Sequence, residues 1–191
     1  MKSILLSIKP KWVAKILNGE KTIEIRKTMP KCDLPITVYI YCTKDNKQGL
    51  VWDNQGKGPV NSSLFPYGKD CPERHRLVNG KVVAKFTVRK VEEIPSRKFS
   101  VYYFPYTETL DDYDLLTKSC LTTEELGKYL KNKTGYAYHI EDLVIFDKPK
   151  ELSNFYKWCE PFEVNKGCRK VCWKKSLTKA PQNFIYIESE E

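Results

Sequence analysis

The chain has 191 residues, 41% of them hydrophobic and 13% aromatic, which suffices for one domain with a substantial core. No apolar run is long enough to span a membrane, and the first apolar stretch is too short for a signal peptide. With 33 Lys and Arg against 24 Asp and Glu, the net charge of +9 suits a phosphate-bearing partner, although a solvated lysine-rich surface has the same composition.

The first predicted elements are a short strand over residues 3–8 and a helix that begins at Pro10, since proline is favoured at the first helical position. Apolar residues then recur at helical spacing, and Asn18-Gly19 supplies a left-handed stop. These apolar positions are Trp12, Val13, Ile16 and Leu17. Alternation predicts the next strands over residues 22–27, 36–42 and 82–91.

A segment rich in Gly, Asn, Pro and Lys, residues 44–80, is predicted to be a long insertion loop. Further along, Thr122 and Glu125 form a capping box, which predicts a helix. Strands follow over residues 135–140, 143–146 and 183–188, the second of them stopped by Asp147-Lys148-Pro149. About seven short strands with two or three helices indicate an α+β fold or mixed β-barrel. We expect a single domain over residues 1–191, with a basic, cysteine-containing extension over 153–180 before the last strand.

The most informative stretch is Gly-Glu-Lys-Thr-Ile-Glu-Ile-Arg, residues 19–26. On a strand, its two isoleucines face the core, and Thr22, Glu24 and Arg26 project from the opposite face. Arginine suits a phosphate or a base edge, and a glutamate accepts from an exocyclic amine. Lys21 joins this group only if it still belongs to the turn at Gly19. The alternative is an ordinary surface ion pair on an edge strand.

Residues 7–10 and 16–27 resemble the opening of the ASCH domain (activating signal cointegrator homology) family. The resemblance continues over residues 39–43, 80–84, 136–140, 146–152 and 181–187, in the expected order. It implies a PUA-like β-barrel of six or seven strands with flanking helices and a cleft lined by the Gly-x-Lys-x-x-Glu-x-Arg residues. It also implies a role connected with RNA or, less often, DNA.

Some small ASCH-type enzymes deacetylate acetylcytidine with a lysine and a threonine of this motif and a distant glutamate. Lys21 matches their lysine, but Glu24 stands where they have the threonine, and no residue is matched to their glutamate. A threonine hydroxyl attacks a carbonyl, whereas a carboxylate acts as a base or hydrogen-bond acceptor. We therefore expect a protein that binds acetylated cytidine without turning it over.

Several residues outside the motif are further candidates. Lysines on or beside the first helix and strand could form a phosphate-binding rim, or could be a solvated surface. These lysines are Lys9, Lys11, Lys15, Lys27 and Lys31. Tyr39 and Tyr41 share a strand face, from which they stack on bases or else close the core. His139 needs a carboxylate or thiol partner to be catalytic and otherwise is a hydrogen-bonded structural residue.

The seven cysteines, an odd number without a secretory signal, favour reduced thiols and a cytoplasmic location. Cys159, Cys168 and Cys172 are spaced C-x8-C-x3-C within a basic tail, and Cys71 with His75 forms a separate C-x3-H pair. Zinc requires four such ligands, and this spacing matches no common zinc finger. Zinc is therefore a weak hypothesis, and we expect no cofactor.

Three functions remain open. The leading one is a nucleic-acid-binding module that holds RNA, or a modified or flipped base, in the barrel cleft. The residues expected to contact nucleic acid are Lys21, Thr22, Glu24, Arg26, Lys9, Lys11, Lys27 and Tyr41. The second is a nucleoside hydrolase or ribonuclease of the same fold with Lys21 and Glu24 as its acid–base pair. The third is a protein-interaction adaptor. The absence of nucleotide-binding, metalloprotease and serine-nucleophile motifs favours binding over catalysis.

Overall fold

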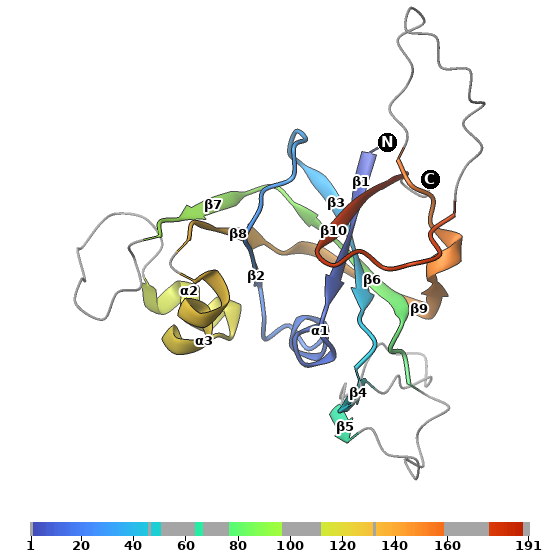
Figure 1. Ribbon diagram of the computed structural model, residues 1–191, viewed down its shortest axis with the longest axis horizontal. Helices are drawn as coiled ribbons and strands as arrows, with labels where there is room; N and C mark the ends of the chain where they lie inside the picture. Colours follow the sequence, from blue (N-terminus) through green and yellow to red (C-terminus); the bar gives the residue numbers. More distant parts are fainter. Residues whose placement is uncertain are drawn as a thin grey trace, which may run out of the picture.

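The computed structural model (Figure 1) describes residues 2–45, 47–50, 64–66, 77–96, 112–131, 133–158 and 176–188. Over these residues the chain has a mixed α+β fold with three α-helices and a short 3-10 turn. The helices are α1 (Pro10–Leu17), α2 (Asp112–Ser119) and α3 (Thr123–Leu130), and the 3-10 turn is Leu152–Asn154. None of the described helices is long and apolar enough to cross a membrane.

The described strands belong to three sheets, one of five strands, one of three and one of two. The five-stranded sheet has the order β10-β1-β3-β6-β9, the three-stranded sheet β2-β8-β7, and β4 pairs with β5. The strands of the first half are β1 (Lys2–Ile8), β2 (Ile23–Arg26), β3 (Ile36–Cys42), β4 (Gln48–Leu50) and β5 (Leu64–Pro66). Those of the second half are β6 (Lys81–Val88), β7 (Val91–Ile94), β8 (Gly135–His139), β9 (Glu141–Glu151) and β10 (Phe184–Glu188).

The five-stranded sheet is covered on both faces, which explains why almost every residue of β1 is buried. Ile4 and Leu6 share the core cluster of α1, because alternate side chains of a strand point to one face. Leu5 points the other way and joins a second cluster with Tyr39 and Phe155. β1 runs parallel to β3 and antiparallel to β10, so the last strand lies beside the first.

The three-stranded sheet packs against α2 and α3, on the left of Figure 1. Ile23 and Ile25 of β2 are buried there with apolar residues of both helices, and this confirms the alternation predicted for the motif. α3 begins at the predicted capping box, in which Thr122 and Glu125 each bond the other's backbone amide. β2 and its neighbouring helices thus place the opposite face of β2 toward α1 (Figure 1).

Two strand predictions are corrected. The predicted strand 82–91 is two strands, because the chain leaves β6 near Arg89 and enters the second sheet as β7. The predicted stop at residues 147–149 is also wrong, since β9 continues to Glu151 and Lys150 pairs with Val82. β9 is an edge strand, and edge strands are where a sheet tolerates a proline such as Pro149.

Neither of the larger sheets closes on itself within the described residues, so a closed barrel is not observed. Within the insertion 44–80, which is predicted to be a loop, β4 and β5 form an antiparallel pair. Residues 46, 51–63 and 67–76 of that insertion lie outside the described residues, as do residues 159–175 of the predicted C-terminal extension.

Candidate functional site

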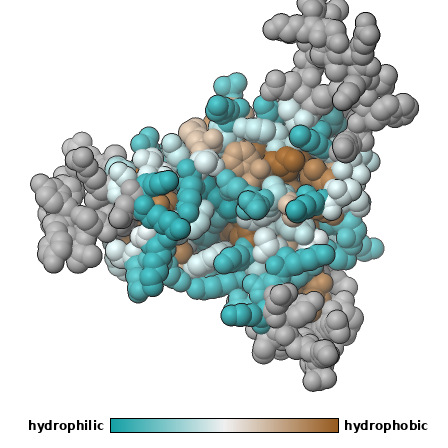
Figure 2. All heavy atoms as spheres, viewed as in Figure 1, coloured by the Kyte–Doolittle hydropathy of each residue, from teal (hydrophilic) through white to brown (hydrophobic). Residues whose placement is uncertain are grey.

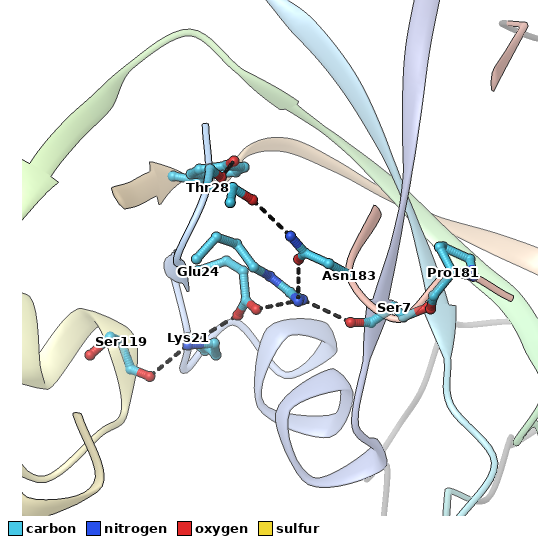
Figure 3. Close-up of polar contacts among 9 residues, drawn as sticks. Ser7, Lys21, Glu24, Thr28, Ser119, Pro181 and Asn183 are labelled. Atoms are coloured by element: carbon cyan, nitrogen blue, oxygen red, sulfur yellow. Dashed lines mark hydrogen bonds and ion pairs between the residues drawn. The ribbon is translucent and has the colours of Figure 1, made fainter. Parts of the chain in front are cut away.

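The predicted motif forms a buried charged cluster between α1 and the α2–α3 pair (Figure 3). After α1 the chain turns at Gly19, whose φ of 76° is in the left-handed region that favours glycine. The backbone amide of Lys21 donates to the carbonyl of Lys15, which holds Lys21 in this turn. Its side chain therefore points to the same side as those of Glu24 and Arg26, as the motif required.

One carboxylate bridges two cations in this cluster. Glu24 Oε1 lies 2.9 Å from Arg26 Nη2, and Glu24 Oε2 lies 3.3 Å from Lys21 Nζ. The side chains of Lys21, Glu24 and Arg26 are only 2%, 8% and 9% exposed. A surface ion pair is therefore the wrong description, although β2 is the edge strand that this alternative assumed.

Backbone carbonyls complete the cluster from two other elements. Lys21 Nζ donates to the carbonyl of Ser119 at the end of α2, at 2.7 Å. Arg26 Nη2 donates to the carbonyl of Ser7 at the end of β1, at 2.8 Å. Buried charges are tolerated when they are paired and their remaining donors are bonded, and these two contacts meet part of that requirement. The cluster joins both sheets and α2.

Asn183, just before β10, extends the network (Figure 3). Its Oδ1 accepts from Arg26 Nη1 at 3.2 Å, and its Nδ2 donates to Thr28 Oγ1 at 2.8 Å. The Tyr138 hydroxyl donates to the carbonyl of Thr28 at 2.6 Å, and burial raises the pKa of Tyr138 far above its usual value. Arg26 is thus held at both Nη atoms, whereas its buried Nε has no hydrogen-bond partner among the described residues.

Aromatic rings and further lysines lie around the cluster. Lys21 Nζ and Lys11 Nζ lie over the Trp12 ring, 5.3 and 4.3 Å from its centre. Lys27 Nζ lies 4.8 Å from the centre of the Tyr129 ring on α3. Tyr129 is 37% exposed, and burial raises the pKa of its hydroxyl while the positive charge of Arg26 opposes that rise. Lys11, Trp12, Lys27 and Tyr129 are called the rim below.

Three predicted site residues lie apart from the cluster. Thr22 is exposed, and its backbone is used to bond Lys118 and Ile140. Lys9 is exposed at the start of α1, at the opposite end of the helix from Lys21. Tyr41 is only 5% exposed and belongs to the core cluster of Tyr39, so its ring is not available to stack on a base.

His139 and Glu92 form a half-buried pair, with Nε2 and Oε2 2.5 Å apart. Burial acts to raise the pKa of Glu92, but hydrogen bonds to Lys90 and His139 outweigh it and lower the pKa. Among the described residues no nucleophile completes this pair into a catalytic set. The geometry fits the hydrogen-bonded structural histidine considered from the sequence.

Only some of the cysteines lie within the described residues. Cys159, Cys168 and Cys172, with Cys71 and His75, lie outside the described residues, so the zinc hypothesis stays a prediction. The described cysteines, Cys32, Cys42 and Cys120, are free thiols. Burial raises the pKa of Cys42 to about 12, which keeps this thiol protonated at neutral pH.

Four contributors to the cluster and rim were missed from the sequence: the Ser7 and Ser119 carbonyls, Asn183 and Tyr129. Backbone carbonyls carry no sequence signal, and Asn183 and Tyr129 meet β2 only through the tertiary fold. Trp12 was identified, but only as an apolar position of the first helix.

A sequence profile described as "ASCH domain" matches residues 6–116. Among solved structures, ASCH from Zymomonas mobilis is similar, with 14% sequence identity over 78% of this chain and 73% of that chain, and a TM-score of 0.47. A ZmASCH mutant protein from the same organism is 14% identical over 80% of this chain and 77% of that chain, with a TM-score of 0.48. A comparison with curated proteins gives no significant match.

Proposed function

Because the chain belongs to the ASCH domain family, we propose that it binds nucleic acid, RNA in the first instance, at the Lys21–Glu24–Arg26 cluster and its rim. The observation that carries the proposal is that two buried cations share one carboxylate, which leaves a net charge of +1 between two aromatic rings. A ligand with both negative charge and aromatic rings matches that surface, and nucleic acids have both.

The cluster has the donors and acceptors that a nucleotide requires. Arg26 presents a planar fork, and its Nε–H is a buried donor with no acceptor in the described part of the chain. Each oxygen of Glu24 retains a lone pair beyond its contact with Arg26 or Lys21, which suits an exocyclic amine. Access requires movement of the rim, because the three side chains are less than one-tenth exposed.

The rim supplies the remaining affinity. Lys11 and Lys27 lie over aromatic rings at its two sides, from α1 and from the end of β2. In this proposal the ammonium group of Lys27 contacts a phosphate, and that of Lys11 does so in exchange for its ion pair with Glu125, 3.1 Å away. The ring of Tyr129 stacks on a base. Tyr41 is left out because it is part of the core, and Lys9 contributes only to the long-range field.

We also propose that the two larger sheets together form a PUA-like barrel. The chain passes from one sheet to the other between β6 and β7, and Arg26 of β2 bonds Ser7 of β1 and Asn183 just before β10. The two sheets are therefore joined at two places, as in an incompletely closed barrel, and the cluster lies at the second junction. This arrangement supports the single domain expected over residues 1–191.

The enzyme hypothesis receives less support from the geometry. Lys21 is already bonded to the carbonyl of Ser119 and paired with Glu24, and the hydroxyl-bearing Thr22 is exposed and apart from the cluster. A general acid–base pair must instead reach a reacting group. Release of cytidine from acetylcytidine, compared between the wild type and Lys21→Met, tests this hypothesis, and turnover that depends on Lys21 would establish it.

Binding is tested by fluorescence anisotropy with single-stranded and duplex RNA and DNA at two salt concentrations. We expect affinity for single-stranded RNA to fall steeply as the salt concentration rises. The slope of log affinity against log salt concentration should decrease by about one unit in Lys27→Ala and in Lys11→Ala. The matched control is Arg89→Ala, which removes one exposed cation paired with Glu141 and Asp142. Equal effects of Lys27→Ala and Arg89→Ala would overturn the proposed interface.

A further inference from the structure

A separate pocket of about 290 Å³ lies beside β10, not over the cluster. Its described lining consists of three lysines, two aromatic residues and one aliphatic residue, with no acidic residue. The lining residues are Lys2, Lys31, Lys157, Trp158, Ile185 and Tyr186. In Figure 2 hydrophobic surface shows over β10, surrounded by hydrophilic residues. None of the six residues belongs to the cluster or its rim.

Tyr186 fixes the positions of the other groups. Its hydroxyl accepts from the backbone amide of Lys31 at 2.6 Å, and Lys2 Nζ lies 4.3 Å from its ring centre. Its carbonyl accepts from the backbone amide of Trp158 at 2.9 Å, and the adjacent Lys157 bridges to Ile187. Three segments distant in sequence are thus attached to one strand, so the pocket is a built feature of the fold.

The pocket combines the two chemistries of a nucleotide. The half-buried Trp158 and Ile185 provide an apolar surface suited to a base, while the side chains of Lys31 and Lys157 are exposed and suited to a phosphate. Glu188 lies opposite Lys2 in the β1–β10 ladder, so the phosphate contacts are assigned to Lys31 and Lys157 rather than to Lys2. Lys2 lies over one face of Tyr186, and the Tyr186 hydroxyl is bonded to the Lys31 amide, so the base is assigned to Trp158.

We propose that this pocket binds one nucleotide unit of a single-stranded nucleic acid, with its base against Trp158 and its phosphate between Lys31 and Lys157. Asn183, which bonds Arg26, precedes Tyr186 by three residues, a distance of about 10 Å along an extended strand. One strand can therefore cover both regions. The inference rests on the proposed function for the class of ligand, a nucleic acid. The pocket residues are assigned independently of that function.

The test is calorimetric titration of the full chain with 5′-AMP, adenosine and inorganic phosphate. We expect 5′-AMP to bind about tenfold more tightly than adenosine or phosphate, because only the nucleotide engages both the ring and the lysines. Lys31→Ala/Lys157→Ala should weaken 5′-AMP binding about tenfold, and Trp158→Leu about fivefold. Trp158→Leu retains apolar bulk and the backbone bond to Tyr186, and a melting curve checks that each variant is folded.

The matched control is Lys133→Ala/Lys148→Ala, which removes two exposed lysines that do not line the pocket. The Lys31→Ala/Lys157→Ala double variant is called the pocket variant. If the control weakens 5′-AMP binding as much as the pocket variant does, or if phosphate binds as tightly as 5′-AMP, the proposal is overturned. A single-stranded RNA octamer distinguishes a strand from a free nucleotide. The octamer must compete with 5′-AMP and must bind the pocket variant more weakly, and failure of either overturns the proposal.

Failure of the pocket and failure of the proposed function give different results. If only the pocket fails, the pocket variant binds the octamer normally while Lys27→Ala weakens it. If only the proposed interface fails, Lys27→Ala and Lys11→Ala bind the octamer normally, while 5′-AMP binding still depends on Lys31 and Lys157.

Discussion

The cluster and the pocket hold positive charge in opposite ways. In the cluster, Lys21 and Arg26 are buried and share Glu24, and their other donors bond carbonyls of α2 and β1. In the pocket, Lys31 and Lys157 are exposed at the edge of β10 with no acidic residue in the described lining. In the proposals above, the buried charge of the cluster contributes to folding as well as to ligand binding, whereas the exposed charge of the pocket contributes to ligand binding alone. Substitutions should therefore separate the two regions by their effect on stability.

The largest effect is expected for Glu24→Gln. This change leaves Lys21 and Arg26 buried without their counterion, and breaking a buried ion pair by removal of one partner costs about 3–5 kcal/mol. Urea denaturation should show this loss in the free energy of unfolding. The matched control is Glu141→Gln, whose partner Arg89 is exposed, so its loss should change the free energy of unfolding far less. Equal losses in the two variants would show that the cluster is solvated.

A smaller effect is expected for Lys21→Met. The remaining Glu24–Arg26 pair is neutral overall, so the main cost is the carbonyl of Ser119 left without its donor, about 1–3 kcal/mol. Denaturation of the two variants side by side should place Lys21→Met clearly above Glu24→Gln in stability. The reverse order would mean that Lys21, not the shared carboxylate, holds the cluster together.

The capping box of α3 should contribute less, because it is exposed. Thr122→Ala removes the side-chain cap, and the free energy of unfolding should fall by about 1 kcal/mol. The backbone hydrogen bond from Thr122, with a smaller contribution from Lys11, lowers the pKa of Glu125 below 4.5 in the folded protein. The stabilisation by the ionised Glu125 carboxylate is therefore complete above the pKa that Glu125 has in the unfolded chain. It is lost as the pH falls through the pKa of Glu125 in the folded protein.

Thermal melts between about pH 6 and pH 3 test that contribution. The melting temperature of the wild type should exceed that of Glu125→Gln at about pH 6, and this difference should disappear as the pH falls. A stability difference that is constant across this range would show that Glu125 acts by shape and not by charge.

The smallest effect is expected in the pocket. Lys31→Ala/Lys157→Ala removes only exposed side chains, while the backbone bonds to Tyr186 and Ile187 remain. The free energy of unfolding should change by no more than about 0.5 kcal/mol per substitution. A loss comparable to that of Lys21→Met would mean that these lysines support the fold, and the contrast between the two regions would not hold.

Local sequence rules predicted the parts of the site that depend on neighbouring residues. Alternation placed Ile23 and Ile25 in the core and Glu24 and Arg26 on the other face, and Gly19 indicated the turn that brings Lys21 to them. The first helix and the capping box were predicted for the same reason, since their signals lie within a few residues.

The remainder depends on contacts across the chain. Arg26 bonds Asn183 over 157 residues of sequence, and no local pattern connects them. The pocket is still less visible, because Lys2, Lys31 and Lys157 come from three segments that meet only on Tyr186. Tyr41 was misplaced at the interface because alternation shows two faces of a strand but not that both are covered.

The position of Asn183 has a consequence for synthesis of the protein. A nascent chain that has emerged only as far as β8 already contains β2, α2 and α3, but it lacks the residue that binds Arg26 Nη1. The cluster is completed only when β10 has docked beside β1, and contacts between such distant segments form late because loop closure costs entropy. Docking of the last strand is therefore the step that gives Arg26 Nη1 its hydrogen-bond partner.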